Sequence, residues 1–201
     1  MKSSLLIVPS LLGVLTLAGC GTPPTGAQYI DPNGQRAIVD VGKIDFQDFN
    51  SAASDLVQSL LNSNVIQQRR PGQPALFAIS RITNDTDQQF DTDQLIGNMR
   101  TMLLHSGKVQ TLSTVGLGQV QDPLAQQEAA KNAFVQNQGQ PNPIPDYTLT
   151  GKILMQKTQA GNVNQTAYTF YLTLTDVTTQ AAVWEEHKQI VKQGKESSIG
   201  F

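Results

Sequence analysis

The 201-residue sequence has few of the residues from which chemical sites are built. It contains one cysteine, Cys20, so no internal disulfide can form and the stability of the chain must come from its core. Its two histidines, His105 and His187, have no neighbour at the spacing of a metal ligand. Only 15% of the residues are charged and the net charge is −2, which leaves no basic field for nucleic acid.

The short motifs of common enzymes are also missing. No Gly-x-Ser-x-Gly or Ser-x-x-Lys motif occurs. Gly116 and Gly118 have no third glycine, which argues against a dinucleotide site. The aspartates between residues 85 and 93 lack the glycine and glutamate of a calcium loop, so we interpret them as turn formers and helix caps. We therefore predict a protein that is not an enzyme and has no catalytic residues, no metal site and no cofactor.

The only long apolar run lies at the N terminus. It follows Lys2, is too short to span a bilayer, and is broken by Pro9 and Gly13, which is typical of a secretory signal peptide over residues 1–19. Its end, Leu17-Ala18-Gly19-Cys20, resembles the lipobox of bacterial lipoproteins. The resemblance implies cleavage before Cys20, which then carries a diacylglycerol and an acyl chain. Such chains anchor firmly, because each buried CH₂ contributes about 0.8 kcal/mol. Gly21, which is not aspartate, favours the periplasmic face of the outer membrane.

Residues 20–44 read as the lipidated cysteine and a flexible tether, because residues 21–35 are rich in Gly, Pro, Thr and Asn. Residues 37–39 could instead be a short strand or an ordered arm. Fully extended, residues 21–43 would reach about 80 Å at ~3.3–3.6 Å per residue. Residues 45–201 are long enough for a single globular domain.

Helical periodicity predicts three helices in that domain. The first begins near Asp45 or Asp48 and buries Phe49, Ala52, Ala53, Leu56, Val57 and Leu60. The second runs from about Thr92 to Ser106, with Asp91 as N-cap and Gly107 as the left-handed residue after its end. The third opens at Asp122-Pro123 and buries a face of Leu124 or Ala125, Ala129, Ala133 and Phe134.

Strand patterns lie between and after these helices. The predicted strands are Ala75–Ile82, Lys108–Val115, Tyr147–Ile153, Tyr168–Thr175 and Ala182–Val191, the last two joined by a turn at Asp176–Ala181. The order is α-β-α-β-α-β-β-β. It predicts an α/β (α+β) fold with a mixed sheet of four to five strands flanked by about three helices. We expect Trp184 in the core and Arg69-Arg70 in a solvated loop.

Several segments resemble the LpoB lipoproteins, which are outer-membrane activators of class A penicillin-binding proteins. The segments are Ile79–Thr86 with its Asn-x-Thr turn, Asp91–Ile96, Leu103–Val109 with Ser-Gly-Lys, Asp146–Gly151, Leu172–Asp176 and Ala182–Glu185. The resemblance covers about residues 46–193. Members of this family carry a long proline-rich tether, whereas the tether here is short.

The resemblance implies a lipid-anchored monomer that binds a bifunctional peptidoglycan synthase and activates it without catalysis. Arg81, Asn84, Thr86 and Phe90 lie at the end of a predicted central strand, where we expect a partner-binding patch. Two alternatives stay open. One is a structural or secretion-associated lipoprotein of the curli-pore type with a similar domain fold. The other is a periplasmic hydrolase, although the sequence offers no candidate carboxyl pair.

Overall fold

The computed structural model describes residues 29–31, 34, 39–115, 119–120, 123–135 and 144–195. Its elements are α1 (Phe46–Asn62), β1 (Ala75–Ile79), β2 (Thr83–Asp85), α2 (Asp93–His105), β3 (Val109–Val115), β4 (Gln119–Val120), α3 (Pro123–Val135), β5 (Tyr147–Ala160), β6 (Val163–Asp176) and β7 (Ala182–Lys195). The predicted fold class is confirmed. The two additional strands, β2 and β4, are too short to show a periodic pattern in the sequence.

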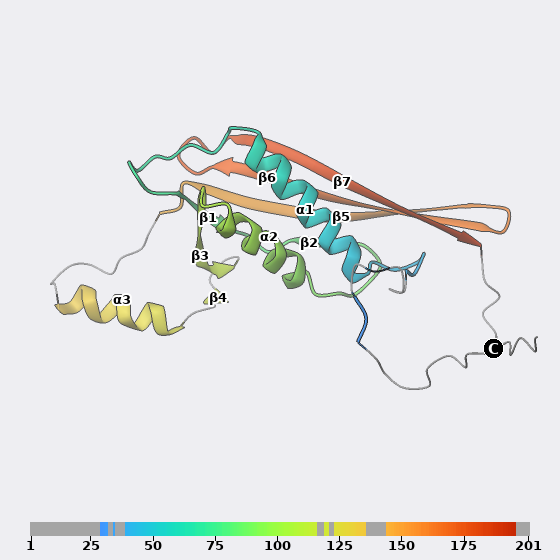
Figure 1. Ribbon diagram of the computed structural model, residues 1–201, viewed down its shortest axis with the longest axis horizontal. Coiled ribbons are helices and arrows are strands. Elements are labelled where there is room, and N and C mark those ends of the chain that lie inside the picture. The colour runs from blue at the N-terminus through green and yellow to red at the C-terminus, as the bar shows by residue number, and fades with distance from the viewer. Residues whose placement is uncertain are drawn as a thin grey trace, which may run out of the picture.

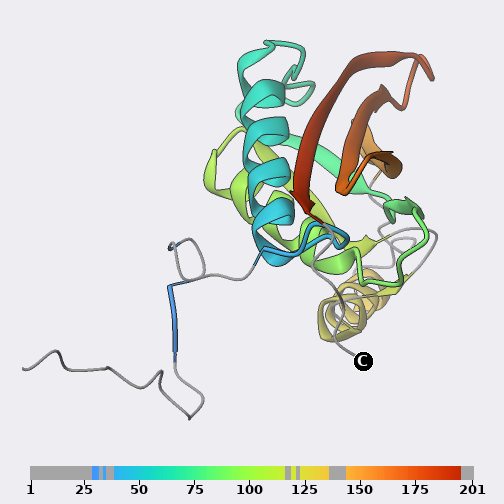
Figure 2. The same cartoon turned by 90° about the vertical axis from the view of Figure 1, so that its right-hand side faces the viewer.

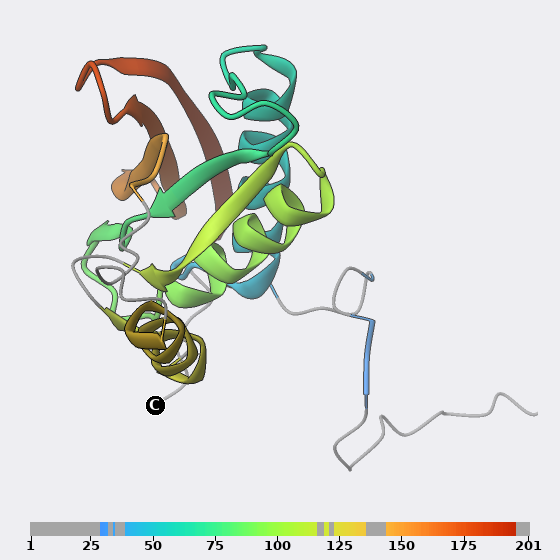
Figure 3. The same ribbon diagram turned by 90° about the vertical axis from the view of Figure 1, so that its left-hand side faces the viewer.

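The strands form one mixed seven-stranded sheet in the order β4-β3-β1-β5-β6-β7, with β2 paired to β5 (Figure 1). β1 is parallel to both β3 and β5, whereas β5, β6 and β7 are antiparallel neighbours. Helices α1 and α2 lie together on one side of this sheet (Figures 2 and 3). The core is the layer of apolar side chains between these two helices and the sheet.

Helix α1 begins with a capping box. Asp45 Oδ1 accepts from the N–H groups of Gln47 and Asp48, and Asp48 Oδ2 accepts from the Asp45 N–H at 2.8 Å. The apolar stripe predicted for this helix is buried throughout: Phe49, Ala52, Ala53, Leu56, Val57 and Leu60. The predicted start and face of α1 are therefore confirmed.

Helix α2 begins one residue later than predicted. Its N-cap is Thr92, whose hydroxyl donates to the Ile82 carbonyl instead of capping the helix. The residue before this N-cap, Asp91, makes the capping hydrogen bond instead, because its Oδ1 accepts from the Asp93 N–H at 2.8 Å. Gly107 has a φ of 68°, which confirms the predicted left-handed residue.

The apolar face predicted for α3 is wrong. Leu124 and Phe134 are 66% and 87% exposed, and none of the α3 side chains that the structure describes is buried. Helical spacing places such residues on one side of a helix, but burial needs a neighbouring surface, which the core formed by α1, α2 and the sheet does not provide here. The predicted cap, Asp122, and the side chains of Ala125, Ala129 and Ala133 lie outside the described residues.

The long hairpin of β5 and β6 exceeds the predicted strands. Each strand has 14 residues, and the connection passes through Gly161 at a φ of 60°. The predicted alternation is confirmed, because one face buries Tyr147, Leu149, Ile153, Tyr168, Phe170, Leu172 and Leu174. Gly151 belongs to the same row. A Cβ there would lie 2.6 Å from the Tyr171 carbonyl oxygen, so only glycine fits.

Arg69 and Arg70 lie in a loop as expected, with Arg69 exposed and Arg70 partly buried, but both form ion pairs that the sequence did not indicate. Arg69 forms an ion pair with Asp176 and lies 5.2 Å from the centre of the Tyr147 ring. Arg70 Nη2 lies 3.0 Å from Asp146 Oδ2. Both aspartates are buried and far from the arginines in sequence, which hides the pairing from local analysis. Trp184 was expected in the core, and its half-buried side chain packs against the core.

Candidate partner-binding surface

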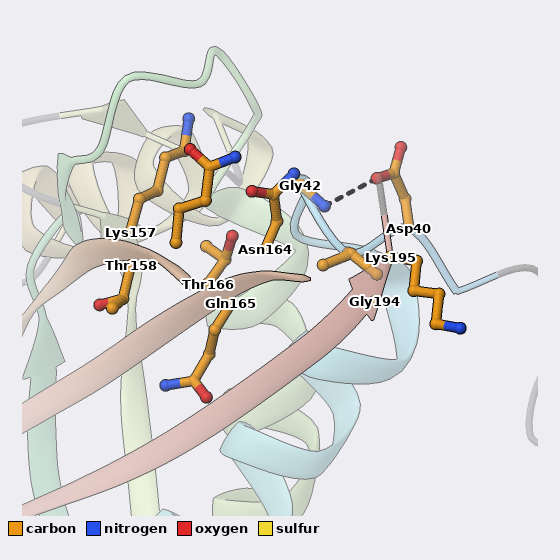
Figure 4. Close-up of a pocket in the computed structure, with 11 residues that line it drawn as sticks. Asp40, Gly42, Lys157, Thr158, Asn164, Gln165, Thr166, Gly194 and Lys195 are labelled. Carbon is orange, nitrogen blue, oxygen red and sulfur yellow. Dashed lines mark hydrogen bonds between the residues drawn. The ribbon is translucent and has the colours of Figure 1, made fainter. Parts of the chain in front are cut away.

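Residues 40–45, named the strap here, lie beside the start of β6 and the end of β7, before α1 begins. Val41 sits over Gly194 of β7, where an added Cβ would lie only 2.6 Å from Val41 Cγ2. Gly42 N–H donates to Asp40 Oδ1 at 2.8 Å, which turns the chain at this point (Figure 4). Of residues 37–39, considered as a short strand or an ordered arm, only Val39 is among the described residues, and it is exposed and belongs to no strand.

Gln88 ties the strap to the loop of residues 84–90. Its Nε2 donates to the Gly42 carbonyl at 2.6 Å and to the Tyr168 hydroxyl at 2.7 Å, and its Oε1 accepts from the Ile44 N–H at 3.0 Å. Burial raises the pKa of Tyr168, and the hydrogen bond with Gln88 opposes this only in part. The phenol therefore stays neutral and available to Gln88 at physiological pH.

A buried ion cluster holds the other end of the strap. Lys192 of β7 is 7% exposed, and its Nζ lies 2.7 Å from Asp45 Oδ2 and 2.6 Å from Asp48 Oδ2. The same ammonium donates to the Lys43 carbonyl at 2.8 Å. Burial by itself would lower the pKa of Lys192, but the hydrogen bonds to both aspartates outweigh burial and the pKa is raised. The charged lysine thus joins β7 to the start of α1.

Strap, hairpin and β7 together enclose a groove of about 660 Å³ (Figure 4). Its lining consists of Asp40, Val41, Gly42, Lys157, Thr158, Gln159, Asn164, Gln165, Thr166, Gly194 and Lys195. Most of these groups are amides, hydroxyls and backbone, which bind polar ligands through hydrogen bonds. None is a histidine or a cysteine, and the lining offers no nucleophile activated by a neighbouring base.

The predicted partner-binding residues occupy three different environments. Arg81 is exposed. Asn84 and Thr86 hold the loop together, because Asn84 Oδ1 accepts from the Thr86 hydroxyl at 2.7 Å and Asn84 Nδ2 donates to the Gln88 carbonyl. Phe90 packs edge-on against Phe49, with ring centres 5.5 Å apart. The structure thus brings the segment together as one loop, and its role in binding stays a prediction.

The residues that connect this loop to the rest of the molecule were missed in the sequence. Nothing in the sequence singled out Gln88, and Lys192 lies one residue beyond the predicted strand Ala182–Val191. Gln88 meets Gly42 across 46 residues, and Lys192 meets Asp45 across 147 residues. No local pattern signals such contacts, although an isolated lysine at an inward position of a strand is a hint that a partner exists.

The two histidines and the cysteine noted in the sequence remain to be placed. His187 stacks on Tyr171 with ring centres 5.4 Å apart, on the face of β6 and β7 away from the helices, and His105 ends α2. Cys20 lies outside the described residues, so its lipidation stays a prediction.

Within the described ranges, no group of three or more His, Cys, Asp or Glu residues could hold a metal ion. No helix in that part of the chain is long and apolar enough to cross a membrane.

The described residues form a small α+β domain with a groove between its strap, its β5–β6 hairpin and β7. A family model described as "Peptidoglycan-synthase activator LpoB" matches residues 48–190, from the first turn of α1 to β7. The chain therefore belongs to the LpoB family, which confirms the resemblance noted in the sequence. No curated protein matches the chain.

Solved structures similar to this chain include other LpoB domains. The LpoB C-terminal domain from Salmonella enterica is 14% identical, with a TM-score of 0.44 over 71% of this chain and 98% of that one. The NMR structure of Escherichia coli LpoB is 17% identical, with a TM-score of 0.40 over 93% and 91%. The lipoprotein GNA1162 from Neisseria meningitidis is 12% identical, with a TM-score of 0.39 over 63% and 88%.

Proposed function

We propose that this protein is a lipid-anchored, non-catalytic activator of a class A penicillin-binding protein. The observation that carries the proposal is the family match, which spans α1 to β7 and therefore nearly all of the folded domain. The lipid on Cys20 would hold the protein at the periplasmic face of the outer membrane. The domain would then reach the synthase on a tether of limited length.

The loop of residues 84–90, together with Arg81, is the proposed contact with the synthase. Its tip carries exposed charges at Asp85 and Asp87, and Arg81 lies just before it. Hydrogen bonds within the loop and the packing of Phe90 on Phe49 hold the loop in one shape. A preorganised loop loses less conformational entropy on binding than a flexible one.

Activation without catalysis requires that the domain bind the active conformation of the synthase more tightly than the inactive one. A tenfold increase in the active fraction, starting from a small fraction, needs a difference in binding free energy of about 1.4 kcal/mol. One or two well-formed polar contacts supply that amount. A difference of one or two polar contacts between the two conformations of the synthase would therefore suffice for the proposed role.

The test combines binding with activity. The protein is used to capture the periplasmic domains of class A synthases, and captured synthases are then assayed for glycan polymerisation with and without it. We expect binding, a faster polymerisation rate, and a weaker effect with Arg81→Ala. Lys131→Ala on α3 also removes one exposed positive charge and should change nothing. Absence of binding to every class A synthase would refute the proposal.

A further inference from the structure

The side chain of Gln88 joins the strap to the candidate contact loop. Gln88 bonds to the strap at both the Gly42 carbonyl and the Ile44 N–H, and to the body of the domain at the Tyr168 hydroxyl. The Gln88 backbone also closes the loop, because its carbonyl accepts from Asn84 Nδ2 at 2.7 Å. The position of the strap therefore bears directly on the shape of the loop.

We propose that the strap, residues 40–45, controls the order of the 84–90 loop, so that displacing the strap loosens the loop and seating it holds the loop ready for a partner. This inference rests on the proposed function in one respect, namely that this loop is the proposed contact with the synthase. Coupling of this kind is reciprocal. A partner that binds the ordered loop also favours the seated strap.

The contacts along the strap set the order in which it would detach. The N-terminal part is held by the packing of Val41 on Gly194 and by the bond between Gly42 and Gln88. The C-terminal end is held by the buried Lys192 cluster at Lys43 and Asp45. A pull that arrives along the preceding chain meets the weaker, apolar contact first. Residues 40–42 would thus leave while the helix cap at Asp45 stays in place.

Gly194 allows this contact to be broken selectively. In Gly194→Ala the new Cβ would lie 2.6 Å from Val41 Cγ2, and valine has little freedom at χ1 to avoid it, so the strap must shift. The double variant Gly194→Ala/Val41→Ala removes the clash, because the remaining contact with Val41 Cβ is 3.7 Å. Gln193→Ala, at an exposed position beside Gly194, is the matched control.

The measurement is hydrogen–deuterium exchange of the full chain in detergent, without any partner, followed in peptides covering residues 39–46 and 84–90. In Gly194→Ala we expect both peptides to exchange roughly fivefold faster or more, because the loss of one hydrogen bond changes an opening equilibrium by about that factor. Peptides from β5 and β6 should not change. The double variant should exchange more slowly than Gly194→Ala, because the clash is gone, and Gln193→Ala should exchange like the natural protein.

Two results would overturn the proposal. One is faster exchange at residues 39–46 with no change at 84–90, which would show that the strap moves independently of the loop. The other is no change in either peptide, which would show that the packing of Val41 on Gly194 does not hold the strap. Neither result depends on the synthase, so failure of this inference is distinguishable from failure of the proposed function.

Discussion

Replacing Lys192 with methionine tests how much the buried ion cluster stabilises the domain. The lysine side chain is 6% exposed and bonds to two aspartates and one backbone carbonyl. Methionine keeps a similar length and the apolar packing of the stem, but it leaves Asp48, whose side chain is 7% exposed, without its cation. Removing one partner of a buried pair costs about 3–5 kcal/mol, since a buried charge stays uncompensated.

Lys188→Met on the same strand is the matched control. Lys188 Nζ lies 2.5 Å from Asp55 Oδ2, but the two side chains are 34% and 49% exposed. A pair this open to water contributes about 1 kcal/mol or less. Urea unfolding followed by circular dichroism would give both values. If Lys192→Met lost no more stability than Lys188→Met, the reasoning about burial would be refuted.

The pH dependence of the same cluster gives an independent check. The pKa of Lys192 is raised above its ordinary 10.5 in the folded protein. A raised pKa in the folded state means that the stabilisation is fully present below the pKa of the unfolded chain and is lost as the pH rises through the folded value. The difference in unfolding free energy between the natural protein and Lys192→Met should therefore be constant near neutral pH and shrink above about pH 10.5.

Three other predictions follow from the packing. Gly151→Ala should cost about 1–3 kcal/mol in thermal or urea unfolding, because its Cβ would meet the Tyr171 carbonyl. The pKa of Asp176 is lowered by backbone N–H groups, Thr179 first, and by Arg69, so its stabilisation is present above pH 3.8 and is lost in acid. Asp176→Asn should therefore show a flatter loss of stability below about pH 4 than the natural protein. Phe134→Ala should change stability by less than about 0.5 kcal/mol, because the ring is exposed, and a larger loss would show that α3 is packed.

Helices and strands whose apolar residues recur at a regular interval could be predicted from the sequence. The stripe on α1 and the alternation on β5 and β6 arise because a helix or strand that covers a core must repeat its apolar residues at the period of its backbone. The N-cap of α1 and the left-handed Gly107 are local in the same sense, since each satisfies groups only a few residues away. The family resemblance was also readable, because it depends on the order of such local segments.

What only the tertiary structure decided is which side chains meet across long separations. Phe134 matched a helical face, yet it is exposed because burial depends on a neighbouring surface. Arg69 and Arg70 resembled a solvated loop, yet both pair with buried aspartates. Arg69 reaches Asp176, 107 residues away, and Arg70 reaches Asp146, 76 residues away. Gln88 carries no local signal of its contacts, and Lys192 offers only the hint of a lysine at an inward position of a strand. The connection of strap, loop and β7 exists only because the folded chain brings these segments to the same end of the sheet.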